Sequence, residues 1–80
     1  MTLLEQYIQD LTNGCAYLDA LVAAKTTEKT PHGSWKIQDA VDGVKYQLAL
    51  DEVKNSSEDL SAFNTSVSNA ESYITSIGSP

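Results

Sequence analysis

The fold class is decided by residues 2–24, which read TLLEQYIQDLTNGCAYLDALVAA. Thr2 and Glu5 make the capping box S/T-x-x-E, in which the hydroxyl and the carboxylate each accept a hydrogen bond from a backbone N–H that a helix start leaves unpaired. Apolar residues then recur at alternating steps of four and three, which is the period of one helical face. These residues are Leu4, Ile8, Leu11, Cys15, Leu18 and Val22. The pattern predicts an amphipathic helix over residues 3–24. Gly14 inside it indicates a close contact with another helix or a mild weakness of the helix, with a hinge as the functional alternative.

Residues 25–34, KTTEKTPHGS, interrupt this period. Pro31 has no amide hydrogen, and Gly33 and the threonines are poor helix formers, so we expect a loop here. A second helix is expected over residues 35–54, with Ser34 or Thr30 as its N-cap.

The second helix carries apolar residues on two opposite sides, because successive residues are turned by about 100°. One stripe consists of Ile37, Val41, Val44 and Leu48, and the other of Trp35, Tyr46, Leu50 and Val53. Two short neighbouring helices are not expected to cover both stripes. Such a helix is either the middle element of a bundle or one that gives a face to a partner, and the pattern leads us to expect that a partner protein, a ligand or a second copy covers one stripe.

A third helix is expected over residues 57–77, with Asn55 or Ser56 as its N-cap and the acidic Glu58 and Asp59 in its first turn. Its apolar face consists of Leu60, Phe63, Val67, Ala70, Ile74 and Ile77. One alternative stays open, because Tyr46, Val53, Leu60, Val67 and Ile74 are each seven residues apart. That spacing also suits one uninterrupted helix from Trp35 to Ile77, about 65 Å long, which would require oligomerisation.

Eighty residues suffice for one small domain. The predicted fold class is therefore all-α, a small antiparallel three-helix bundle over residues 1–80. The alternative is an oligomeric helical hairpin with one long second helix.

The chain holds little that could carry out catalysis. Its only cysteine and histidine are Cys15 and His32, and Cys15 lies on the apolar stripe, where a small buried side chain is expected. A structural zinc site needs about four such ligands. The paired carboxylates lie near the expected helix ends, and no glycine-rich phosphate motif is present. We expect a protein that is not an enzyme and holds neither a metal nor a cofactor.

The net charge of the chain indicates which classes of partner it can bind. Eleven acidic residues against five lysines, without arginine, give a net charge of −6. This charge argues against direct binding to nucleic acid or to an anionic membrane, since both need an excess of cations. The chain also lacks a basic leader and a membrane-spanning stretch, and its single cysteine makes no internal disulfide, so we expect a cytoplasmic protein.

The leading hypothesis is an acidic helical binding protein that blocks or scaffolds a larger protein with a basic surface, and that is itself a homo-oligomer. Tyrosines bury area while keeping a polar tip, and carboxylates attract a basic partner. The candidate contacts are Tyr17, Asp19, Tyr46, Asp51 and Glu52. In size and acidity the chain resembles immunity proteins and phage-borne inhibitors, among them anti-CRISPR proteins. A structural subunit of a larger assembly is a further possibility.

The loop suggests a different function. Residues 25–36 carry a net charge of +2, whereas residues 1–24, 37–54 and 55–80 carry −3, −2 and −3. Lysines, threonines and an aromatic ring together can hold a phosphorylated nucleotide. The alternative is a solvated linker, in which the lysines follow the end of the first helix and Trp35 fills the core. The candidate ligand-binding residues are Lys25, Thr26, Thr27, His32, Trp35 and Lys36. The stretch with Trp35, Asp42 and Leu48 to Leu50 is similar to small helical phage proteins that sequester cyclic nucleotides as oligomers, although the lack of arginine and the helix after residue 57 depart from them.

Overall fold

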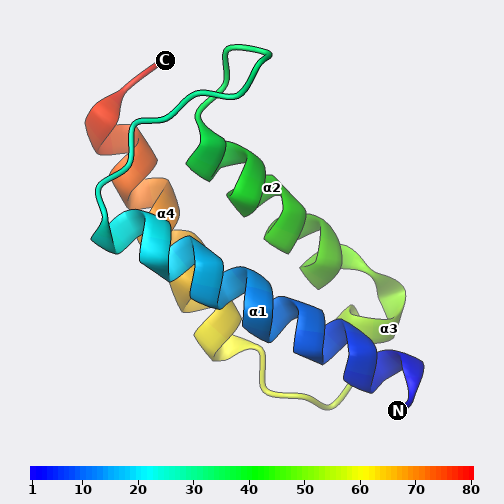
Figure 1. Cartoon of the computed structure of the whole chain (residues 1–80). Helices are drawn as coiled ribbons and strands as arrows, with labels where there is room; N and C mark the ends of the chain where they lie inside the picture. Colours follow the sequence, from blue (N-terminus) through cyan, green and yellow to red (C-terminus); the bar gives the residue numbers. More distant parts are fainter.

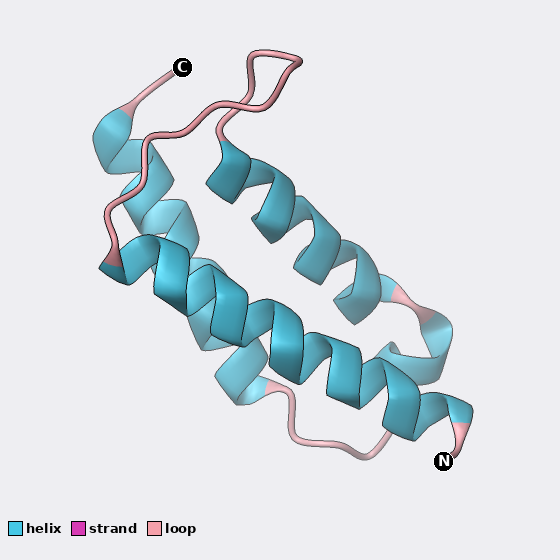
Figure 2. Cartoon of the chain, in the orientation of Figure 1, coloured by secondary structure: helices cyan, strands magenta, loops and turns pink.

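The computed structural model describes all residues from 1 to 80 and contains four helices (Figure 1). They are α1 (Leu3–Ala23), α2 (Lys36–Ala49), α3 (Asp51–Lys54) and α4 (Ser61–Ile77). The three long helices pack side by side, α2 running opposite to α1 and α4, while the residues outside the four helices form loops and turns (Figure 2). The prediction of a small all-α bundle is confirmed. No helix is long and apolar enough to cross a membrane.

Helix α1 begins as the sequence predicts. The Thr2 hydroxyl accepts a hydrogen bond from the Glu5 amide, and the Glu5 carboxylate accepts one from the Thr2 amide, each at 3.1 Å. The end of α1 carries no glycine, yet the chain still turns. Lys25 takes a positive φ of 51°, and the amides of Lys25 and Thr26 donate to the carbonyls of Val22 and Leu21. These are the two hydrogen bonds of a Schellman motif, with lysine at the position that glycine usually fills.

The hydrophobic core lies between α1, α2 and α4. Its ten buried residues include Leu11 and Leu18 of α1, Val41 of α2 and Ala70 of α4, all at 0% exposure. The stripe that starts at Ile37 faces this core as predicted. Cys15 is also buried, as expected for a small apolar side chain on this face.

The prediction that the second stripe needs an external cover is wrong for most of its residues. Trp35 is 9% exposed, Val53 is fully buried and Leu50 is partly buried, so that Tyr46, at 70%, is the one exposed member. The prediction assumed a continuous helix from 35 to 54. However, α2 ends at Ala49, and Leu50 is extended, with φ −62° and ψ 136°. This break turns the following residues, so Val53 of α3 faces the core.

The alternative of one uninterrupted helix from Trp35 to Ile77 is also wrong. The chain breaks at Leu50 and again over residues 55–60, and the molecule measures 37 × 23 × 17 Å. The predicted start of the last helix at residue 57 is four residues early, and neither Asn55 nor Ser56 is its N-cap. Instead, the Asp59 carboxylate accepts hydrogen bonds from the amide and hydroxyl of Ser61, at 3.0 and 2.6 Å.

The start of α2 uses backbone rather than a side-chain cap, so neither Ser34 nor Thr30 is the N-cap. Trp35 occupies the cap position, and the Lys36 amide donates to the Glu28 carbonyl at 2.8 Å. Thr30 serves the loop instead, since its hydroxyl accepts hydrogen bonds from the amides of His32 and Ser34, both at 3.2 Å.

The two helical glycines are expected to respond differently to alanine. A Cβ at Gly43 would meet no atom within 4 Å, whereas a Cβ at Gly14 would lie 3.3 Å from the Val44 side chain. Gly43→Ala should therefore stabilise the fold by about 0.5–1 kcal/mol, and Gly14→Ala should gain less because of crowding. Urea unfolding followed by circular dichroism measures both. Equal gains at the two positions would contradict the close packing at Gly14.

The carboxylates at the helix starts should make stability depend on pH. The Thr2 amide lowers the pKa of Glu5 from 4.5, and the Ser61 hydroxyl lowers the pKa of Asp59 from 3.8. Because each folded pKa lies below the unfolded one, their stabilisation is present above the unfolded pKa and is lost as pH falls through the folded pKa. A Glu5→Gln/Asp59→Asn double variant should thus lose less stability than the original chain between about pH 5 and about pH 2.

Acid titrations monitored by circular dichroism test this expectation. The control Asp10→Asn/Glu71→Gln removes the same charge from exposed positions in the interiors of α1 and α4. If the control also loses less stability at low pH, general repulsion between carboxylates, and not the helix starts, sets the dependence of stability on pH.

Candidate functional site

Trp35, the proposed stacking surface of the loop, is part of the core. Its indole N–H donates to the Gly78 carbonyl at 2.8 Å, and the Lys29 ammonium lies 5.9 Å from the ring centroid. The ring is therefore not free to stack on a nucleotide base.

Lys36 and Thr26 of the proposed ligand-binding set also make contacts within the chain. The Lys36 ammonium lies 3.3 Å from the Glu28 carboxylate, which raises the Lys36 pKa, and Tyr17 adds to this effect. The Tyr73 hydroxyl donates to the Thr26 carbonyl at 3.0 Å, which ties the loop to α4. Lys25, Thr27 and His32 are exposed, and no residue of the proposed ligand-binding set lines any of the four surface hollows. The fold thus leaves these residues without a common pocket.

The five predicted partner contacts do not form one patch. Tyr17 lies between α1 and α2, and Tyr46 is exposed on α2. Asp19 is on the side of α1 that faces α4, where its carboxylate accepts a hydrogen bond from the buried Ser66 hydroxyl at 3.3 Å. Asp51 and Glu52 lie on α3, at the end of the bundle. The structure therefore separates the tyrosines from the acidic pair.

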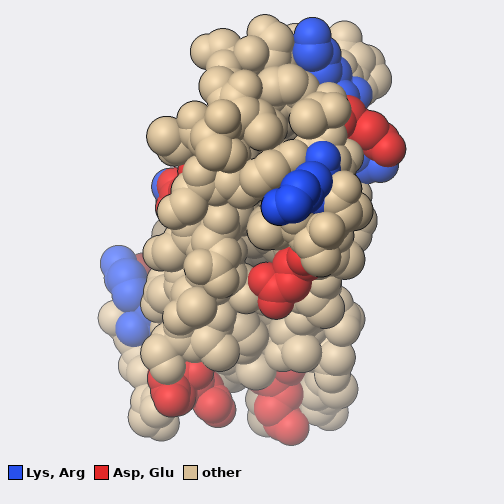
Figure 3. Space-filling view, turned by 90° about the vertical axis from the view of Figure 1, so that its left-hand side faces the viewer, with Lys and Arg blue, Asp and Glu red and all other residues tan.

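Acidic side chains gather at the end of the bundle formed by the start of α1, by α3 and by residues 55–60. This acidic end carries five exposed carboxylates, those of Glu5, Asp51, Glu52, Glu58 and Asp59. Lys54 is the one lysine there, 3.6 Å from Asp51. The lysines of the loop lie at the opposite end, so the molecule is electrostatically polarised (Figure 3). This separation of charge could not be predicted from sequence position, because residues 5, 51 and 58 come to the same end of the bundle only in the folded chain.

Two hollows open at the acidic end. One, of about 260 Å³, lies against Glu5 and Glu58 and also against the apolar side chains of Met1 and Ile8. A lysine or arginine could lay its aliphatic stem on the apolar wall and bring its charge to the carboxylates. The other, of about 290 Å³, is lined by Asp51, Glu52 and Asn55.

A third hollow, of about 220 Å³, forms a groove between α1 and α2. Its lining includes Gly14, Ala40 and Gly43, which are small, together with Tyr17 and Asp10. We call it the α1–α2 groove. No lysine lines it, and Tyr17, at 47% exposure, forms part of its wall.

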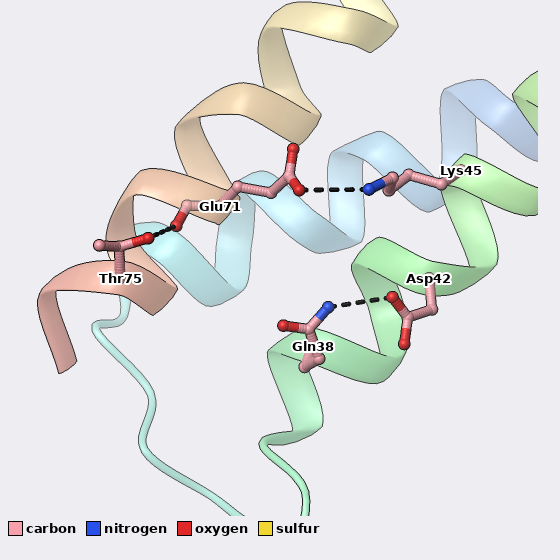
Figure 4. Close-up of polar contacts among 5 residues, drawn as sticks. All are labelled: Gln38, Asp42, Lys45, Glu71 and Thr75. Carbon is pink, nitrogen blue, oxygen red and sulfur yellow. Dashed lines mark hydrogen bonds and ion pairs between the residues drawn. The ribbon is translucent and has the colours of Figure 1, made fainter. Parts of the chain in front are cut away.

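The largest hollow, of about 380 Å³, lies between α2 and α4 over Leu48 and Val67. Lys45 and Glu71, also in its lining, approach each other across it at 3.3 Å (Figure 4). The Gln38 amide donates to Asp42 along α2 at 2.9 Å. Since Lys45 and Glu71 neutralise each other, this hollow offers no net charge to a partner.

The nucleophile and the base that could catalyse a reaction lie in different environments. Cys15 is in the core, where burial raises its thiol pKa, while His32 is exposed in the loop. No group of three or more histidine, cysteine or acidic side chains could hold a metal ion. The candidate site consists of the acidic end and the α1–α2 groove.

Comparison with known proteins adds no relative: no protein-family model, no curated protein and no solved structure matches this chain. The class that fold and surface define is a small, acidic, polarised helical bundle.

Because Trp35 is buried and Lys36 is paired, nucleotides are not expected to stabilise the fold. A specific ligand at 100 times its dissociation constant would add about 2.7 kcal/mol. Thermal unfolding with cyclic and linear nucleotides should therefore show no shift. A shift that Lys25→Ala or Lys29→Ala removes would restore the nucleotide hypothesis.

Proposed function

We propose that this chain is a non-enzymatic binding protein that docks on a basic surface of a larger protein and thereby blocks or scaffolds it. The observation that carries the proposal is the gathering of Glu5, Asp51, Glu52, Glu58 and Asp59 at one end of the bundle, with a single lysine among them. Such a field attracts a basic partner over a distance comparable to the Debye length, about 10 Å at 0.1 M salt. An inhibitor of the immunity or anti-defence type, acting in the cytoplasm, agrees with this surface.

The shape of the acidic end supports the same function. Its hollow beside Glu5 and Glu58 combines carboxylates with the apolar Met1 and Ile8, which suits a long basic side chain. The exposed carboxylates are surface groups, so they contribute more to the rate of association than to its strength.

Homo-oligomerisation stays a prediction, but the main observation expected to support it is not found in the structure. It rested on an uncovered second stripe of α2, which the chain itself covers apart from Tyr46. The larger basic protein is therefore the partner that we propose.

Neutralising the acidic end should slow association. In the triple variant Asp51→Asn/Glu52→Gln/Glu58→Gln, we expect the association rate to fall at least about tenfold at low salt, because electrostatic steering contributes on the order of 10- to 1000-fold. The control Asp19→Asn/Asp39→Asn/Glu71→Gln removes the same charge elsewhere and should have a smaller effect.

The measurement uses the immobilised full chain and a protein that it retains from a native lysate, purified and applied at several salt concentrations in surface plasmon resonance. Rates that fall steeply with salt, and further in the triple variant than in its control, support the proposal. Rates that are insensitive to salt and to the triple variant would overturn it, as would a lysate from which no basic protein is retained.

A further inference from the structure

We propose that the α1–α2 groove is the docking site for one segment of the partner, which places an arginine side chain between Asp10 and Tyr17 and brings its backbone close to Gly43. This inference rests on the proposed function and specifies where specific contact occurs. It assigns the groove a role distinct from that of the acidic end.

Gly43 is the first reason for choosing this groove. It lies inside α2, where glycine weakens a helix relative to alanine, and a Cβ there would meet nothing within 4 Å. Gly14, across the groove, already has a reason within the fold, because its absent Cβ leaves room for Val44. No contact within the chain explains Gly43, but the close approach of another backbone would.

The exposed tyrosines are the second reason. Tyr17 forms part of the groove wall, and Tyr46 lies on α2 three residues after Gly43, 70% exposed. Tyrosine is enriched among the residues that carry most of the binding energy in interfaces. These are the two most exposed aromatic side chains of the chain, and both belong to the two helices that form the groove.

Charge determines the occupant. The Asp10 carboxylate lines the groove and has no ion-pair partner in the chain, and Asp39 and Asp42 are exposed on the same helix as Tyr46. Lys36 lies near Tyr17 but is neutralised by Glu28. The groove therefore favours a cation from outside the chain.

Arginine fits these walls better than lysine. Its planar guanidinium can stack on the Tyr17 ring and still donate two hydrogen bonds to one carboxylate. A second copy of the chain is the wrong occupant, because this sequence contains no arginine and carries a net charge of −6.

The test uses the full chain, labelled with ¹⁵N, and synthetic helical peptides of identical length that carry arginine, lysine or glutamine at the same positions. We expect the arginine peptide to shift the amide signals of Gly14, Gly43 and Gln47, with several-fold weaker binding of the lysine peptide. The glutamine peptide should cause little shift.

Three variants separate docking from folding. Gly43→Leu fills the groove and should weaken binding of the arginine peptide at least tenfold without lowering the melting temperature, because leucine is a better helix former than glycine. Asn69→Leu, which adds the same side chain to an exposed position of α4, should change the affinity less than twofold. Asp10→Asn should remove the preference for arginine over lysine.

The outcomes distinguish this inference from the proposed function. If Gly43→Leu and Asp10→Asn leave peptide binding unchanged, or if neither basic peptide binds, the groove is not the docking site, whereas the salt-dependent rates of the purified partner still decide the function. Signals in the groove that shift with protein concentration alone would assign it to a second copy and overturn the inference.

Discussion

The break in α2 at Leu50 is the constraint on which the rest of the structure depends. A helix continued through Leu50 would carry Val53 to the side away from the core, and an apolar stripe would face solvent. The extended backbone at Leu50 redirects the chain, so that Val53 becomes fully buried and α3 closes the end of the bundle. The same turn brings Asp51 and Glu52 to the end where α1 begins. Burial of Val53 and placement of Asp51 and Glu52 at the acidic end therefore have one cause.

Features that depend on local hydrogen bonds or on one helical period could be predicted from the sequence. The capping box of Thr2 and Glu5, the core-facing stripe from Ile37 and the burial of Cys15 all belong to this kind. Helix boundaries that depend on tertiary contacts could not. The start of α2 uses the backbone of Glu28, and no residue type near Trp35 reveals such a pairing.

The types of residue at the candidate site could be predicted from the sequence, but their arrangement in space could not. The sequence indicates Tyr17 and Tyr46 as contacts by their aromatic character alone, and both are exposed in the structure. Their neighbours could not be foreseen, because Asp10 lines the same groove as Gly43 only after two helices have packed. Trp35 shows the opposite case. Its place among lysines suggested a ligand surface. In a small domain, however, a large aromatic ring stabilises the fold more when it lies in the core, because it buries much apolar area there.

The two parts of the proposed surface, the acidic end and the α1–α2 groove, differ in the physical interaction by which each would bind a partner. The acidic end is exposed and polar, so its charges act at a distance and in a salt-dependent manner, but they hold a partner weakly once water surrounds the contact. The α1–α2 groove carries a single lining carboxylate, yet it offers small residues and a tyrosine wall from which water can be excluded. Attraction at the acidic end therefore affects mainly the rate of association, and close contact in the groove affects mainly the rate of dissociation. Glu5 and Asp10 are five residues apart on α1 and are therefore turned by about 140° around its axis, so the hollow beside Glu5 and the α1–α2 groove face different sides of this helix, and a partner must reach around the helix to contact both.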